Sequence, residues 1–171
     1  MASVVFFRAV NVGGHQKFQP SKLAKELAAF NVVNLGAAGT FVVRENVSAA
    51  RLRAEILHRL PFAPELLIHP AAAVRELIAC EPFRDAPVGK DLGWYVSVLA
   101  KAPRAVPALP FEQPAGAKWE VRLTAVRGPF VLSVRRLGET YANAVVEKLF
   151  GRPATTRNWN TLEAIGKSLS S

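Results

Sequence analysis

Residues 3–9 read Ser-Val-Val-Phe-Phe-Arg-Ala, and residues 40–44 read Thr-Phe-Val-Val-Arg. Both stretches are short, apolar and rich in β-branched and aromatic side chains, which is the pattern of a buried strand. Between them lies a helical stretch that places Leu23, Leu27 and Phe30 on one face. The opening of the chain therefore predicts strands that pack against an amphipathic helix.

The other elements of the first half follow in a recognisable order. Residues 32–35 form a short strand, and the turn at 36–39 joins it to the strand at 40–44 as a hairpin. A helix after the predicted N-cap Ser48 and a fourth strand at 66–69 complete the series. The order strand, helix, strand, strand, helix, strand is that of a ferredoxin-like (βαββαβ-type) unit, with an antiparallel sheet and two helices on one face.

The second half predicts a less regular version of the same plan. A helix follows Pro70, and the proline-rich stretch from 103 to 114 is interpreted as a rigid, extended connection. Further strands and helices are expected at 94–99, 118–126, 130–135, 141–150 and 159–169. We therefore expect an α+β protein with two ferredoxin-like lobes, at 1–80 and 81–171, or with one compact domain over 1–171.

The strand at 118–126 alternates between apolar and polar residues, which is typical of a half-exposed antiparallel strand. The side chains expected to face the core are Trp119, Val121, Leu123 and Ala125. The polar positions of this strand and its neighbour carry Arg122, Arg127, Arg135 and Arg136. A basic sheet face can follow a phosphodiester backbone, but the aromatic residues that would stack on bases lie in the apolar register. A solvated face is therefore the favoured interpretation.

Composition limits the class of protein. Of 171 residues, 50% are hydrophobic, and there is one cysteine, Cys80, so an internal disulfide and a cysteine-based zinc cluster are excluded. No apolar run reaches about 18 residues, and we expect a soluble, cytoplasmic protein. Cys80 ends an apolar helical face and is predicted to be an inert core thiol. The histidines His15, His58 and His69 lack metal-ligand spacing, so no catalytic residue, metal or cofactor is predicted.

Charge is the first indication of a partner. The chain has 22 Lys and Arg residues against 13 Asp and Glu, a net charge of +9, and its pI is about 10.3. The excess is spread evenly, with 11 basic and 7 acidic residues in 1–90 and 11 and 6 in 91–171. This balance favours an anionic partner such as nucleic acid or a phosphorylated ligand. The same net charge is equally consistent with a cationic surface whose only role is to keep the protein in solution.

Two segments carry the residue types that an anion site needs. The loop Asn11-Val12-Gly13-Gly14-His15-Gln16-Lys17 follows the first strand, where glycines let backbone N–H groups approach an anion and Lys17 adds a charge. A plain tight turn explains the same glycines. The second segment, residues 154–161, reads Ala-Thr-Thr-Arg-Asn-Trp-Asn-Thr. Here Arg157 can hold a phosphate and Trp159 can stack on a base.

The structural alternative for the second segment is the beginning of a helix, with Asn158 as its N-cap and Trp159 packed inward. Both interpretations are compatible, because a helix N-terminus also attracts anions. We expect the two segments to meet in one binding pocket. Its predicted residues are Arg8, Asn11, Gly13, Gly14, Lys17, Thr156, Arg157, Asn158, Trp159 and Asn160.

Two motifs together resemble a known family. The stretch Phe7-Arg8-Ala9-Val10-Asn11-Val12-Gly13-Gly14 and the segment Ala154–Thr161 are similar to the bacterial family catalogued as domain of unknown function 1697. The strand entry at 39–43 and the helix end at 147–151 fit the same pattern. The resemblance implies an α+β protein with ferredoxin-like lobes, and it implies no particular activity, substrate or cofactor.

The sequence departs from that family's pattern in two places. Ala37 and Ala38 stand where polar side chains are expected before a strand, and Ala142 stands in place of one before a helix. If the polar groups of relatives hold a ligand, these alanines predict weaker binding here.

The favoured function is non-catalytic binding of an anionic partner, with nucleic acid ahead of a small phosphorylated ligand. An enzyme acting on a nucleotide or phosphate ester stays open, with Arg157 as the anion clamp and His15 as a base. A protein-interaction module or a homodimer is the third possibility, which an exposed apolar patch would mark.

Overall fold

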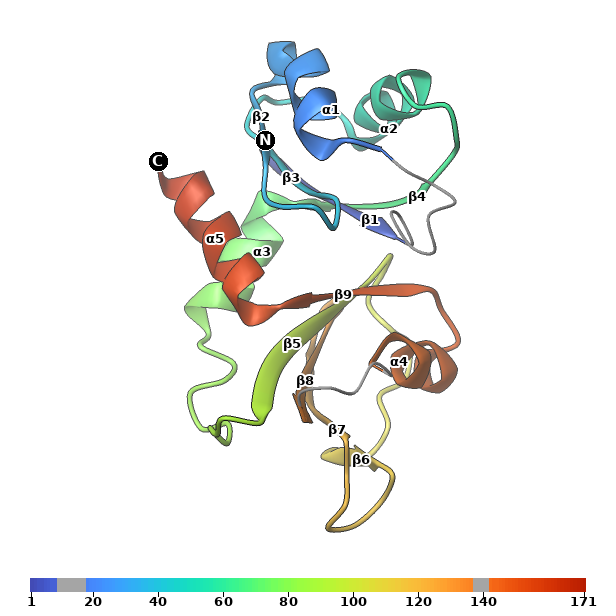
Figure 1. Cartoon of the computed structure of the whole chain (residues 1–171), viewed down its shortest axis with the longest axis vertical. Helices are drawn as coiled ribbons and strands as arrows, with labels where there is room; N and C mark the ends of the chain where they lie inside the picture. The colour runs from blue at the N-terminus through green and yellow to red at the C-terminus, as the bar shows by residue number, and fades with distance from the viewer. Residues whose placement is uncertain (9–17, 137–141) are drawn as a thin grey trace. The chain divides into compact units, whose positions relative to one another are not determined.

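The computed structural model describes residues 1–8, 18–136 and 142–171, which form two compact units (Figure 1). The first unit comprises Met1–Glu76 with Glu163–Ser171, and the second comprises Leu77–Leu162. Two antiparallel sheets and five α-helices make up the described part of the chain, so the predicted α+β class is confirmed. The division into domains at 80/81 stays a prediction.

The first unit is built around a four-stranded sheet. Its elements are β1 (Ser3–Arg8), α1 (Pro20–Glu26), the 3-10 helix η1 (Ala28–Phe30), β2 (Val32–Asn34), β3 (Thr40–Val43), α2 (Ala49–His58) and β4 (Glu65–Pro70). The strands lie in the order β2-β3-β1-β4, and every neighbouring pair is antiparallel. This is the ferredoxin-like order that the first half of the sequence predicts.

The helices α1 and α2 cover the same face of the sheet of the first unit (Figure 1). That face carries Val5 and Phe7 of β1, which pack in one buried cluster with Leu23 of α1 and with Leu52 and Ile56 of α2. Burial of these apolar side chains is the main stabilising contribution to the unit. The predicted N-cap of α2 is confirmed, because the Ser48 hydroxyl accepts a hydrogen bond from the backbone N–H of Arg51 at 3.2 Å.

The end of the chain joins the first unit through two arginines. Nη2 of Arg44 donates to the carbonyl oxygen of Ser168 at 2.6 Å and to Oγ of Ser171 at 2.8 Å. Nη2 of Arg75 donates to the carbonyl oxygen of Leu169 at 3.2 Å. These bonds engage carbonyl groups in the last turn of α5 (Trp159–Ser170), where a helix has no internal donors left.

The second unit repeats the sheet order of the first with one helix fewer. Its elements are the end of α3 (Ala71–Ala79), β5 (Leu92–Leu99), β6 (Phe111–Gln113), β7 (Val121–Arg127), β8 (Phe130–Arg136), α4 (Ala142–Phe150), β9 (Ala154–Asn158) and the start of α5. The strands lie in the order β6-β7-β8-β5-β9. The last four match β2-β3-β1-β4 of the first unit, and β6 is added at the edge. Between β5 and β7 the chain forms the proline-rich connection instead of a helix.

Three details of the second unit differ from the sequence prediction. Ala154–Asn158 is a strand, β9, because its pairing with β5 supplies partners for a polar segment that has no apolar alternation. The short strand β6 interrupts the proline-rich connection. The predicted core position Ala125 is also wrong, since a bulge between Leu123 and Ala125 shifts the register and turns Val126 toward the core instead.

Cys80 is exposed, so its prediction as a core thiol is wrong. It follows the last residue of α3 and lies between two exposed residues, Ala79 and Glu81, and its Sγ lies 3.0 Å from the carbonyl oxygen of Leu77. Within the residues that the structure describes, no helix has the length and apolar character needed to cross a membrane.

We expect the substitution Arg44→Ala to lower the free energy of unfolding by roughly 1–3 kcal/mol, because it removes charge-assisted hydrogen bonds to the end of α5. Thermal and denaturant unfolding measure the loss, and hydrogen exchange should show faster exchange in the last turn of α5. The control Lys25→Ala changes an exposed side chain of α1 and should leave both quantities unchanged. Equal stability of the two variants would contradict the anchoring role.

Candidate functional site

A cavity of about 350 Å³ lies in the second unit where β5, β9 and the start of α5 meet. Its lining residues are Val88, Gly89, Leu92, Gly93, Trp94, Tyr95, Asn158, Trp159 and Asn160. We call it the Trp94–Trp159 pocket. Its geometry follows from the antiparallel register of the two strands, which places Tyr95 directly opposite Asn158. Three of the residues predicted from the closing segment, Asn158, Trp159 and Asn160, are therefore brought together in one cavity.

Two indoles of the pocket are held by a buried phenylalanine. Phe83 is only 3% exposed; the Trp94 ring stacks on it at 5.3 Å between centroids, and Trp159 meets it edge-on at 5.2 Å. Nε1 of Trp94 also donates to the carbonyl oxygen of Pro87 at 3.0 Å. The inward packing predicted for Trp159 is thus compatible with lining the cavity. The aromatic wall is preorganised, because these contacts fix both rings before any ligand arrives.

Asn158 is the N-cap of α5, as predicted. Its Oδ1 accepts from the backbone N–H of Thr161 at 2.9 Å and from the Thr161 hydroxyl at 3.0 Å. The side-chain oxygen is thereby committed to the helix. Its amide nitrogen, and the exposed side chain of Asn160 next to it, are the polar groups that the cavity offers to a ligand.

A cation lies beside the tyrosine of the pocket. The guanidinium carbon of Arg135 is 4.2 Å from the centroid of the Tyr95 ring, within the range of a cation–π contact. Arg135 on β8 pairs with Gly93, two residues before Tyr95 on β5, so the arginine can lie diagonally across the tyrosine without a competing side chain. The Nε of Arg135 is buried and has no hydrogen-bond partner within the described residues.

A chain of hydroxyl and amide groups connects the strands to α4. Oγ of Ser97 and Oγ1 of Thr156 are 2.8 Å apart, and the Thr156 hydroxyl donates to Oδ1 of Asn143 on α4. Ser97 is fully buried, and so is Ser133 on β8. These groups fix Thr156 on the α4 side of β9. Thr156 does not line the Trp94–Trp159 pocket.

Arg157 lies on the opposite face of β9, since successive side chains of a strand point to opposite faces. It is 7% exposed, and its Nη1 donates to Oγ1 of Thr155 at 2.7 Å and to the carbonyl oxygen of Thr156 at 3.1 Å. Burial lowers the pKa of Arg157 from its ordinary value to about 10, so the side chain stays protonated at neutral pH. The folded chain loses this proton at a lower pH than the unfolded chain does. The contribution of Arg157 to the free energy of unfolding therefore increases as the pH rises above about 10.

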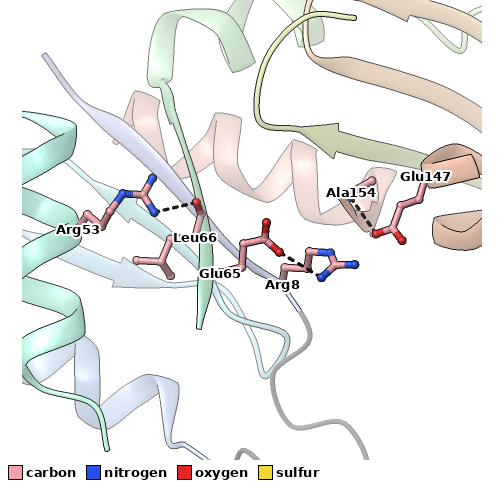
Figure 2. A network of polar contacts seen from close by, with 6 residues as sticks. All are labelled: Arg8, Arg53, Glu65, Leu66, Glu147 and Ala154. Carbon is pink, nitrogen blue, oxygen red and sulfur yellow. Dashed lines mark hydrogen bonds and ion pairs between the residues drawn. The ribbon is translucent and has the colours of Figure 1, made fainter. Parts of the chain in front are cut away.

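The opening segment belongs to the first unit. There Nη1 of Arg8 lies 3.1 Å from Oε2 of Glu65, its cross-strand neighbour on β4, and Arg53 donates to the carbonyl oxygen of Leu66 at 3.1 Å (Figure 2). Both side chains of the ion pair are partly exposed, so it contributes little to stability. The predicted site residues Asn11, Gly13, Gly14 and Lys17, and the candidate base His15, lie outside the described residues. The meeting of the two segments in one pocket stays a prediction, as does the role of Arg157.

The family model for a protein of unknown function, DUF1697, matches residues 1–126 of the chain. This chain belongs to the DUF1697 family. The match includes the opening motif at 7–14 and the first part of the second unit, and it ends before the closing segment at 154–161. The resemblance to this family is therefore confirmed.

A solved structure supports the fold of this DUF1697 member. The conserved bacterial protein SP0830 from Streptococcus pneumoniae aligns over 98% of both chains with a TM-score of 0.59 and 17% sequence identity. At that identity, the likeness establishes the fold alone. No curated protein matches the chain.

Sequence reasoning missed the part of the DUF1697 member's pocket that comes from β5, above all Trp94 and Tyr95, and it missed the contact of Arg135 with the Tyr95 ring. Trp94 and Tyr95 begin a predicted strand, and nothing local indicated that β9 would pair with it. The Thr-Thr pair at 155–156 was the available signal, because β-branched residues favour strands. Among residues 1–8, 18–136 and 142–171, no group of three or more His, Cys, Asp or Glu side chains is placed to hold a metal ion.

We expect Thr156→Val to lower the free energy of unfolding by about 1–3 kcal/mol, because it leaves the buried Ser97 hydroxyl and the Asn143 amide without their shared partner. Chemical denaturation measures the change. The matched control is Thr124→Val on β7, whose hydroxyl makes one long hydrogen bond of 3.3 Å to the carbonyl oxygen of Leu132. A loss at Thr156 no larger than that at Thr124 would show that the network does not fix α4 to the sheet.

Proposed function

We propose that this protein binds nucleic acid without catalysing a reaction on it, and that the Trp94–Trp159 pocket receives one base of a single strand. The observation that carries the proposal is the pocket itself. Aromatic rings and side-chain amides share one small cavity at the start of a helix, and the Arg135 guanidinium lies over the ring of one lining residue, Tyr95.

The size and chemistry of the pocket support a single base. Its volume of about 350 Å³ is at the lower end of the range for small-molecule sites. The Tyr95 and Trp159 rings offer aromatic surface of the kind on which bases stack. The amide nitrogen of Asn158 and the side-chain amide of Asn160 match the acceptors and donors of a base edge.

The charge of the second unit supports an anionic partner. Residues 77–162 contain 12 Lys and Arg residues against 7 Asp and Glu. Phosphates adjoining a base in the pocket would meet this excess, with Arg135 beside Tyr95 as the first contact. The opening segment, with Arg8, Gly13, Gly14 and Lys17, stays a candidate phosphate contact of the same partner.

Fluorescence anisotropy with labelled single-stranded DNA and RNA of about 12 nucleotides tests the function. We expect binding at low salt whose log–log salt dependence has a slope of roughly −0.7 for each phosphate neutralised. A free nucleoside monophosphate should compete weakly, since it presents one phosphate instead of several. Competition by the mononucleotide as strong as that by the oligonucleotide would favour a small phosphorylated ligand, and no binding at low salt would refute the proposal.

Two substitutions locate the binding site. We expect Arg135→Gln and Asn160→Ala each to weaken binding by roughly 5- to 100-fold, because the first removes a phosphate contact and the second a base-edge contact. The matched control is Arg104→Gln, which removes the same charge from an exposed position of the same unit. If Arg104→Gln weakens binding as much as Arg135→Gln does, binding depends on net charge and not on the pocket.

A further inference from the structure

We propose that the second unit holds another binding site, a groove beside α4 that takes a small amphiphile with an apolar chain and a carboxylate. The groove has a volume of about 580 Å³. Its lining residues are Phe111, Gln113, Pro114, Glu120, Val121, Ala144, Val145, Lys148 and Leu149. We call it the α4 groove. Its residues are all different from those of the Trp94–Trp159 pocket, so the two proposals stand or fall separately.

The groove exists because the second unit lacks one helix. In the first unit, α1 lies against β2 and α2 lies against β4, so both halves of the sheet face are covered. In the second unit, α4 lies against β9, β5 and β8, and no helix stands between β5 and β7 in the sequence. On the half of the face formed by β6 and β7, the buried Val121 and Leu123 pack with Val146 and Leu149 of α4 and with Leu109 of the proline-rich connection. The groove opens beside this cluster, where Phe111, Val121 and Leu149 line it.

The two sides of α4 have different roles. On one side, Asn143 accepts from the Thr156 hydroxyl. On the same side, Oε1 of Glu147 accepts from the backbone N–H of Ala154 at 2.9 Å, as Figure 2 shows. These bonds hold the helix over β9. The opposite side, with Ala144, Val145 and Lys148, borders the groove. The spacing of these residues matches one stripe of a helix, so a single side of α4 forms the wall.

The floor of the groove is continuous with the hydrophobic core. Val121 is buried in the core cluster of the second unit, and Phe111 and Leu149 are partly buried against the same cluster. With Pro114, Ala144 and Val145 they make most of the lining apolar. The volume lies within the range of small-molecule sites. When an apolar chain binds in the groove, the apolar surfaces of both the groove and the chain are removed from water, and this burial favours binding.

Lys148 determines the head group. It is the one cation among the lining residues, it is exposed, and no ion pair engages it within the described residues. Glu120 is the one acid, on the β7 side of the groove. The positive balance of the second unit, 12 basic against 7 acidic residues, favours an anionic head group over a cationic one. A carboxylate beside Lys148 satisfies the ammonium group while the chain lies on Phe111 and Val121.

Calorimetric titration with hexanoate, octanoate and decanoate below their micelle concentrations tests the site. Each buried methylene should tighten binding by about 4-fold, so decanoate should bind best. In nuclear magnetic resonance spectra, the amide signals of α4 and β6 should shift, and those of the Trp94–Trp159 pocket should not. No binding by millimolar decanoate, or shifts confined to other elements, would overturn the proposal.

Two charge variants separate the head-group contact from general attraction. Lys148→Gln should weaken decanoate binding 5-fold or more and leave 1-decanol unaffected, whereas Glu120→Gln should tighten decanoate binding. The control Lys101→Gln removes an exposed charge of the same unit and should have little effect. An equal loss in Lys148→Gln and Lys101→Gln would refute the contact.

A third variant tests the groove without changing its charges. Ala144→Trp adds bulk at an exposed position that lines the groove, and it should abolish decanoate binding with an unchanged thermal unfolding midpoint. Undiminished binding in this folded variant would overturn the assignment. Oligonucleotide binding should be the same in all these variants, because none of them touches the Trp94–Trp159 pocket.

Discussion

The pairing of β9 with β5 is the interaction on which the architecture of the second unit depends. It joins residues 154–158 to residues 95–99, which lie about sixty positions earlier in the chain. Through it, Asn158 faces Tyr95, α5 starts at the pocket, and Arg157 is carried to a buried position on the other face. Without this pairing, the closing segment is a polar linker between two helices. With it, the same residues become a strand whose two faces have different roles.

Each unit buries an apolar cluster on one face of its sheet, and the two units differ in the number of helices that cover that face. The first unit places two helices over the cluster that contains Val5 and Phe7. The second unit places α4 over the corresponding half. Its connection between β5 and β7 is a proline-rich stretch, which cannot form a helix. An apolar groove that opens next to the core marks a place where another molecule can bind. The order of the elements therefore produces the α4 groove, and the side chains that line it, Lys148 among them, select its ligand.

The positive charge of the protein is less freely available than its net value of +9 suggests. The guanidinium carbons of Arg122 and Arg136 lie 4.2 and 4.7 Å from the Trp119 ring, and Arg122 also binds Glu112. Arg135 lies over Tyr95, and Arg157 is buried. These contacts combine the alkyl and planar surfaces of arginine with aromatic rings, which lysine does less well. Several of the arginines thus lie against aromatic rings at defined positions, where a guanidinium and a ring can contact the same ligand.

Local patterns in the sequence determined the α+β class, the ferredoxin-like order of the first unit and the cap at Ser48, because apolar periodicity and capping depend on neighbouring residues. They also identified Asn158, Trp159 and Asn160 as a group. Only the tertiary structure decided that Thr155 and Arg157 lie in a strand, that Val126 replaces Ala125 in the core, and that Tyr95 faces Asn158. Each of these depends on the register between distant strands, and a polar strand becomes stable only after its partner is in place.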